Sequence, residues 1–154
     1  MVVNGIPADV IVNGDQMGVS LMLTGNQTRA PKGALQVDKF GKEEKHQFMV
    51  MVGTTCTGNM LPIQCIWSGK TSVSLPTVTA RKDVEKEGHI FTPGGANHWS
   101  TLNPLPQWLD NIVIPHLKEV VHERGLKSPV GLVVIDCWQV HRSKEFLEVM
   151  KCDY

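Results

Sequence analysis

Hydrophobic residues fall into short, strand-length runs in the first half of the chain. The β-branched run at 10–12 is followed at once by turn-forming residues, so it predicts a buried strand over 9–15 with Asp15 at its end. Residues 18–23 resume the apolar character and are expected to continue this strand. The pattern therefore places a carboxylate at or near the end of the first core strand.

Two further apolar runs lie on either side of a Thr-Gly-Asn turn. The runs cover 47–53 and 60–67, and the turn covers 57–59. Two such runs joined by a short turn with glycine and asparagine predict a β-hairpin. Because proline cannot donate a backbone hydrogen bond, Pro62 is expected at the start of the second strand or on a sheet edge.

The middle of the chain lacks a clear period. Residues 68–106 are rich in Gly, Pro, Ser, Thr and Asn, and they predict irregular structure with one short helix. Residues 25–33 predict a loop, and the polar residues 39–45 predict a charged connection.

A helical repeat appears in the second half. Apolar residues at three- and four-residue steps predict an amphipathic helix over 105–124, with a kink or break at Pro115 and a stop at Gly125. The near-continuous apolar run 130–136 predicts a strand covered on both faces, inside a parallel or mixed sheet. Residues 144–150 open another helix. Strands and helices in this order predict a single α/β domain.

Composition narrows the classes of function. The chain has 154 residues, enough for one domain with a real core, and 15 basic residues balance 15 acidic ones. A chain without excess positive charge does not hold a polyanion by its overall field, so binding to nucleic acid would need a local site or a basic module elsewhere. No apolar run reaches membrane-spanning length, and the N-terminus does not resemble a secretory signal. The four cysteines include no Cys-x-x-Cys pair, which favours reduced thiols in an intracellular protein.

Two aspartates carry the strongest chemical signal. Asp15 and Asp136 each come at or just after an apolar, strand-like run. If the two strands are neighbours in one sheet, the carboxylates meet at the same edge. Repulsion between them is relieved by a divalent cation, and hard oxygen ligands suit Mg²⁺ or Mn²⁺. The plainer alternative is that each aspartate only starts a turn or caps a helix.

Other chemistry-bearing residues are weaker candidates. Ser68-Gly-Lys-Thr71 lacks the earlier glycine of a phosphate-binding loop and predicts an ordinary turn. Cys137, beside Asp136, is more simply explained as a packed thiol than as a nucleophile. His141 is a candidate to steer the site or a backbone phosphate, and the simpler alternative is a structural hydrogen bond. The tryptophans are expected in or near the core.

Four segments together resemble the DDE superfamily endonuclease domain. They are Val12-Asn-Gly-Asp-Gln-Met-Gly-Val19, Gly58-Asn-Met-Leu-Pro62, Ile66-Trp-Ser-Gly-Lys-Thr71 and Leu132-Val-Val-Ile-Asp-Cys-Trp-Gln-Val-His141. The resemblance covers nearly the whole chain, 1–154. The chain is similar in particular to pogo-type transposases and their domesticated relatives, including the jerky-like and centromere-protein-B-like proteins.

This resemblance implies a ribonuclease-H-like fold, a mixed sheet with flanking helices whose first and fourth strands lie side by side. It implies cleavage and joining of DNA strands with two Mg²⁺ or Mn²⁺ ions in the complete domain. Asp15 would be the first catalytic and metal-binding carboxylate, Asp136 the second, and His141 a supporting residue. DNA is the expected partner and the nucleus the expected location, without a membrane, and the full-length protein is a candidate homo-oligomer.

The chain departs from the family pattern at two points. Met17 stands where the family usually has threonine. The third carboxylate lies on a helix well beyond the second, and the residues after Asp136, 137–154, contain no matching stretch. We therefore expect a fragment, truncated before its third metal ligand, that cuts DNA poorly or not at all.

Two other classes of function stay open at this stage. One is a domesticated, non-catalytic module that binds DNA or protein. A small-molecule hydrolase is less well supported, because the sequence has no nucleophile elbow.

Overall fold

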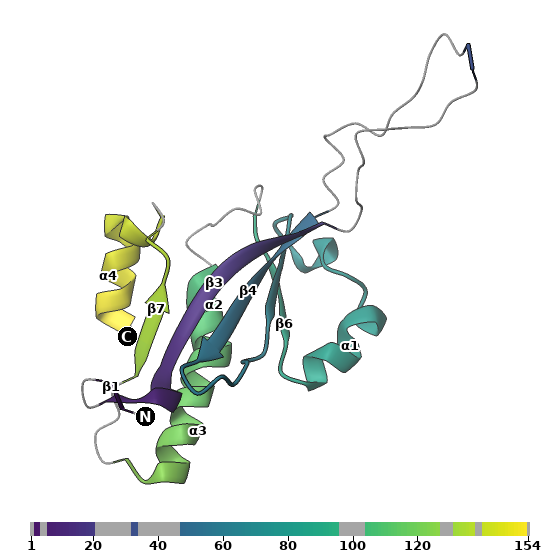
Figure 1. The fold of residues 1–154 in the computed structure, drawn as a ribbon. Helices are drawn as coiled ribbons and strands as arrows, with labels where there is room; N and C mark the ends of the chain where they lie inside the picture. The colour runs from purple at the N-terminus through teal and green to yellow at the C-terminus, as the bar shows by residue number, and fades with distance from the viewer. Residues whose placement is uncertain are drawn as a thin grey trace.

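The computed structural model describes residues 2–3, 6–20, 32–33, 47–95, 104–126, 131–137 and 140–153. These residues form an α/β structure, in which an open mixed sheet of five strands has helices beside it (Figure 1). The strands of this sheet are β3 (Ile11–Ser20), β4 (Gln47–Thr55), β5 (Gln64–Trp67), β6 (Ile90–Pro93) and β7 (Leu132–Ile135). The predicted class, an α/β domain with a mixed sheet, is confirmed.

The strand order is β6-β5-β4-β3-β7. β3, β4 and β5 follow one another antiparallel, whereas β7 runs parallel to β3 and β6 runs parallel to β5. The predicted hairpin is confirmed as the β4–β5 pair, and Pro62 lies just before β5. Near the N-terminus, β1 (Val2–Val3) and β2 (Ile6–Pro7) form a separate antiparallel pair.

Helices and short helical turns lie between the strands and after the last one along the chain. They are α1 (Val78–Lys86), α2 (Pro104–Trp108), α3 (Ile114–Arg124) and α4 (Lys144–Asp153), with the short 3-10 turns η1 (Ala8–Val10), η2 (Ser72–Ser74) and η4 (Val140–Arg142). A π-helical turn, η3 (Leu109–Val113), joins α2 to α3. Pro115 stands at the start of α3, where its missing N–H and fixed φ are tolerated. The α-helical pattern is interrupted by the π turn just before Pro115, so the irregularity lies N-terminal to the predicted position.

The helix also ends as expected. Gly125 adopts the left-handed conformation, with φ 60° and ψ 37°, and its N–H bonds the last turn of α3. Residues with a side chain resist this conformation, so glycine is the natural stop signal.

The core forms where α2, η3 and α3 cross β3 and β4. Trp108 is fully buried, and its indole lies over Gly14 and Gly53, which face each other across the two strands. A Cβ atom on Gly14 would come within 2.6 Å of the indole, and one on Gly53 within 2.8 Å. The two glycines therefore make room for the largest side chain of the core.

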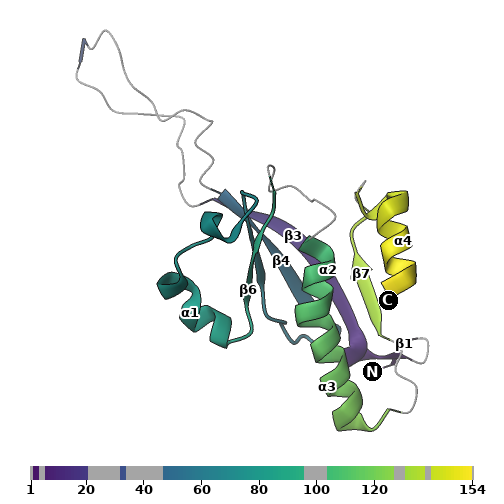
Figure 2. The same cartoon turned by 180° about the vertical axis from the view of Figure 1, so that it is seen from behind.

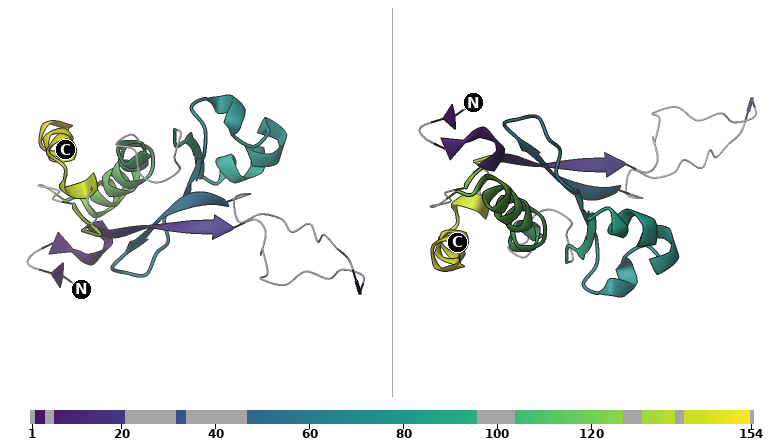
Figure 3. Two further views of the ribbon diagram at one scale, coloured as in Figure 1. Left: turned by 90° about the horizontal axis from the view of Figure 1, so that it is seen from above. Right: turned by 90° about the horizontal axis from the view of Figure 1, so that it is seen from below.

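One face of the sheet carries this helical layer. Phe146 of α4 belongs to the same buried cluster as Val12, Met51 and Trp108, so α4 packs on the same side as α3. Figure 2 looks onto these helices from in front, and Figure 3 shows α3 and α4 on one side of β3. Figure 1 looks from the opposite side, where β3 lies in front of α2.

Three expectations for secondary structure were wrong. Residues 68–106 contain the predicted short helix, α1, but also β6, which is only four residues long and pairs in parallel with β5. The strand predicted over 9–15 begins at Ile11, because residues 8–10 form a 3-10 turn.

The third correction concerns β7, which is not covered on both faces. Leu132 is 41% exposed and Val134 46% exposed, while Val133 and Ile135 pack against the core. Within the described residues β7 is an edge strand of the sheet, and one of its faces is exposed to solvent.

Several other predictions can be placed. β3 continues to Ser20, as expected from residues 18–23, and α4 extends the helix predicted over 144–150. Residues 32–33 form a turn within the predicted loop. The remainder of that loop, residues 21–23 and the connection over 39–45 lie outside the described residues.

Candidate functional site

The two predicted aspartates lie on adjoining strands. β3 and β7 pair in parallel from Ile11 with Leu132 to Gly14 with Ile135. Asp15 follows Gly14 and Asp136 follows Ile135, so the two aspartates come directly after the last paired residues of the two strands. The expectation that their strands are neighbours in one sheet is confirmed.

Asp15 belongs to the face of the sheet that α3 and α4 leave uncovered. Successive side chains on a strand point to opposite faces, so Asp15 shares a face with Asn13. Asp136 follows the last residue of β7, and its carboxylate contacts His141, whose ring packs against Phe146 of the core cluster. Asn13 and Asp15 are exposed, whereas Val12 and Gly14, the residues on either side of Asn13, are buried. We call this uncovered surface of β3 and β7, with the adjoining side chains of β4, the open face.

Hydrogen bonds orient each carboxylate. The backbone N–H of Gln16 donates to Asp15 Oδ1 at 2.8 Å. His141 Nδ1 lies 2.9 Å from Asp136 Oδ1 and 3.0 Å from the Asp136 carbonyl oxygen. Both of these oxygens only accept, so Nδ1 carries the proton and donates. His141 therefore engages one of the two carboxylate oxygens of Asp136.

His141 is itself held in place by packing. Its side chain is only 9% exposed, whereas that of Asp136 is 57% exposed. The imidazole lies against the ring of Phe146, with ring centres 5.4 Å apart. A buried ring that donates to an exposed carboxylate fits both earlier interpretations, a structural hydrogen bond and a supporting role beside Asp136.

A shallow cavity adjoins Asp15 on the β4 side. Its volume is about 230 Å³, and its lining consists of Asn13, Asp15, Met17, Val52 and Thr54. In the β3–β4 register Asn13 lies opposite Thr54 and Asp15 opposite Val52. The open face thus holds Asp15 and a small hollow on its β4 side.

The chemistry of these donors fits a hard cation. Carboxylate oxygens are the ligands that Mg²⁺ and Mn²⁺ prefer, and the exposed position leaves room for the waters that Mg²⁺ retains. Within the described residues no cluster of three or more His, Cys, Asp or Glu side chains is placed to hold a metal ion. Two carboxylates alone would give a weak, incomplete site.

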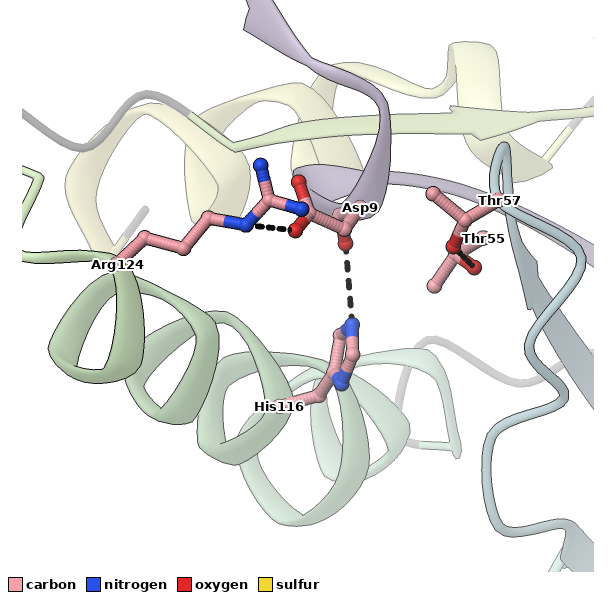
Figure 4. A network of polar contacts seen from close by, with 5 residues as sticks. All are labelled: Asp9, Thr55, Thr57, His116 and Arg124. Atoms are coloured by element: carbon pink, nitrogen blue, oxygen red, sulfur yellow. Dashed lines mark hydrogen bonds and ion pairs between the residues drawn. The ribbon is translucent and has the colours of Figure 1, made fainter. Parts of the chain in front are cut away.

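A buried polar network at the start of β3 is a feature that the sequence analysis did not single out. Asp9, on η1, is buried; its carboxylate contacts Arg124 Nε, and its carbonyl oxygen accepts from His116 Nε2–H at 3.1 Å (Figure 4). Both partners lie on α3, so this network ties the chain just before β3 to the helical layer. A charged residue directly before an apolar strand was the only signal in the sequence.

Other residues with reactive or phosphate-binding potential are the cysteines and the segment 68–71. Cys137 is exposed, so the packed-thiol interpretation was wrong. Ser68-Gly-Lys-Thr71 forms a turn region in which Gly69 pairs with Gly95, as expected. Burial raises the pKa of the Cys65 thiol above its ordinary value, which makes it a poor nucleophile.

The tryptophans partly follow expectation. Trp108 is in the core, and half-buried Trp67 stacks on Phe48 with ring centres 4.7 Å apart. Trp99 and Trp138 lie outside the described residues.

No protein-family model, curated protein or solved structure matches this chain. Among the described residues no helix is both long and apolar enough to cross a membrane.

Proposed function

We propose that this chain is part of a DDE-type, divalent-metal-dependent DNA endonuclease domain with a ribonuclease-H-like sheet. The observation that carries the proposal is that Asp15 and Asp136 come directly after Gly14 and Ile135, the last paired residues of the adjoining parallel strands β3 and β7. The strand order supports it as well, because β7 lies beside β3, while β4 and β5 follow on the other side with antiparallel pairing. The resemblance implies that the first strand lies beside the fourth, whereas β7, the strand beside β3 here, is the fifth strand of the described sheet in chain order, because β6 pairs with β5 at the other edge.

Each residue has a distinct role in the proposed reaction. Asp15 and Asp136 would hold Mg²⁺ or Mn²⁺, and His141 would fix the rotamer of Asp136 through its Nδ1–H bond. A bound ion of this kind activates water or a hydroxyl group and stabilises the leaving oxygen of a phosphodiester. DNA is the proposed substrate, and the nucleus the proposed location of the complete protein.

Catalysis by this chain alone is expected to be poor. The resemblance places a third carboxylate beyond the second, and the described residues bring no third metal-ligating side chain to the carboxylate pair. Two metal ions that act together need more ligands than two aspartates provide.

Calorimetric titration with Mn²⁺ tests the metal site. We expect weak binding by the native chain and at least about tenfold weaker binding by Asp15→Asn and Asp136→Asn, because each loses one charged ligand. Asp83→Asn is the matched control, since Asp83 is exposed on α1 and bonds only the nearby Lys86 in the described residues. Circular dichroism of each variant would confirm that the fold is retained.

Plasmid nicking with Mn²⁺ tests the expectation of low activity. Little or no cleavage is the expected result. Robust turnover that disappears in Asp15→Asn would show that two carboxylates suffice and would contradict the claim of an incomplete site.

A second candidate function is a non-catalytic module that binds DNA or protein. The absence of a three-residue metal cluster from the described part of the chain favours it. If calorimetry detects no Mn²⁺ binding that depends on Asp136, this second candidate replaces the first.

A further inference from the structure

The hollow beside Asp15 is built from side chains that the proposed metal chemistry does not use. Asn13 and Thr54 lie directly opposite each other on β3 and β4, and both line the cavity of about 230 Å³. Within the described residues neither side chain has a hydrogen-bond partner, so their donors and acceptors are available to a ligand. Met17, 53% exposed, and Val52 supply the apolar part of the lining.

The charge of this hollow determines which ligand groups can bind in it. Among the described residues its lining includes the carboxylate of Asp15 and no cationic side chain. A phosphate oxyanion is therefore repelled there until a cation binds. A neutral amide and a hydroxyl, set beside two apolar side chains, instead suit the sugar oxygens and base edge of a nucleotide, with its apolar faces against Met17 and Val52.

We propose that Asn13 and Thr54 hold the sugar and base of the nucleotide adjacent to the phosphate that the metal binds at Asp15 and Asp136. This inference rests on the proposed function and adds a substrate-contacting pair to it. It also sets an order of binding, in which the cation precedes the DNA strand. The pair positions the strand through neutral hydrogen bonds, so it contributes little to the salt dependence of binding.

Fluorescence anisotropy of a short, labelled single-stranded oligodeoxynucleotide tests the pair. In Mn²⁺ we expect Asn13→Ala and Thr54→Val each to weaken binding about 3-fold to 10-fold, because each removes one net hydrogen bond. Thr54→Ser, which keeps the hydroxyl, should bind like the native chain. Ser20→Ala, an exposed substitution near the end of β3, is the control and should also bind normally.

Mn²⁺ calorimetry on the same variants separates the two proposals. Unchanged Mn²⁺ affinity together with weaker oligonucleotide binding supports the role of Asn13 and Thr54. Native-like oligonucleotide binding by the Asn13→Ala, Thr54→Val double variant overturns that role and leaves the metal site standing. Absence of Mn²⁺-dependent oligonucleotide binding by the native chain overturns both the pair's role and the choice of DNA as substrate.

Discussion

The two faces of β3 and β7 come from alternating residues of the same short segments, yet they differ in chemistry. On the helix-covered face, Val12 and Gly14 are buried against Trp108. On the open face, Asn13 and Asp15 are exposed to solvent. Because a slip of one residue would exchange the two faces, the buried set holds the register that places the carboxylates.

The comparison teaches how a polar site is supported. Exposed carboxylates contribute little to the free energy of folding, because they remain in contact with water. Their positions come from the packed residues between them, so stability and metal binding should respond to substitutions on opposite faces.

Replacing Trp108 with alanine should have the largest effect on stability. The indole is fully buried above Gly14 and Gly53, so its loss leaves a large cavity and should cost about 3–5 kcal/mol of unfolding free energy. Urea denaturation followed by circular dichroism measures this cost. Trp67→Ala, at a half-buried position, should cost clearly less; an equal cost would contradict the central place of Trp108.

Adding a methyl group under the indole should have the next largest effect. Gly14→Ala places a Cβ 2.6 Å from Trp108 and should destabilise the fold by about 1–3 kcal/mol. On the same strand, a Cβ at Gly18 would meet only Met49 Sδ, at 3.7 Å, an ordinary contact. Gly18→Ala should therefore lie within about 0.5 kcal/mol of the native chain in the same denaturation experiment.

Neighbouring valines on β7 give the smallest and most direct contrast. Val133 packs against the core and Val134 is 46% exposed. Val133→Thr puts a hydroxyl against apolar neighbours and should cost about 1 kcal/mol. Val134→Thr should change the unfolding free energy by less than about 0.5 kcal/mol. Equal thermal shifts for the two variants would show that the two faces do not differ as described.

Local patterns along the chain sufficed to predict several elements. The hairpin over 47–67, the helix over 105–124 and its stop at Gly125 depend on residues that are close in sequence, so periodicity and turn chemistry predict them. The pairing of β3 with β7 came instead from the resemblance and from two similar apolar runs.

The errors have physical causes that lie beyond local pattern. β6 is four residues long and ends at Pro93, which is too short for a clear period, and it becomes a strand because β5 offers an edge. β7 is apolar throughout, as a strand with two covered faces would be, yet Leu132 and Val134 face solvent. What covers a strand depends on segments distant in sequence, and a single run does not record it.

The amino-acid sequence by itself indicated Asp15 and Asp136 as candidates for metal chemistry, because each comes at or after an apolar run. It also determined the helix that begins near Pro104 and ends at Gly125. Only the tertiary structure decided that the two aspartates follow paired residues of adjoining strands, and that Asn13 and Thr54 line a cavity beside Asp15. Those relations arise from pairing between strands far apart along the chain, where backbone hydrogen bonds and the packing of Trp108 select one register among several that the sequence pattern permits.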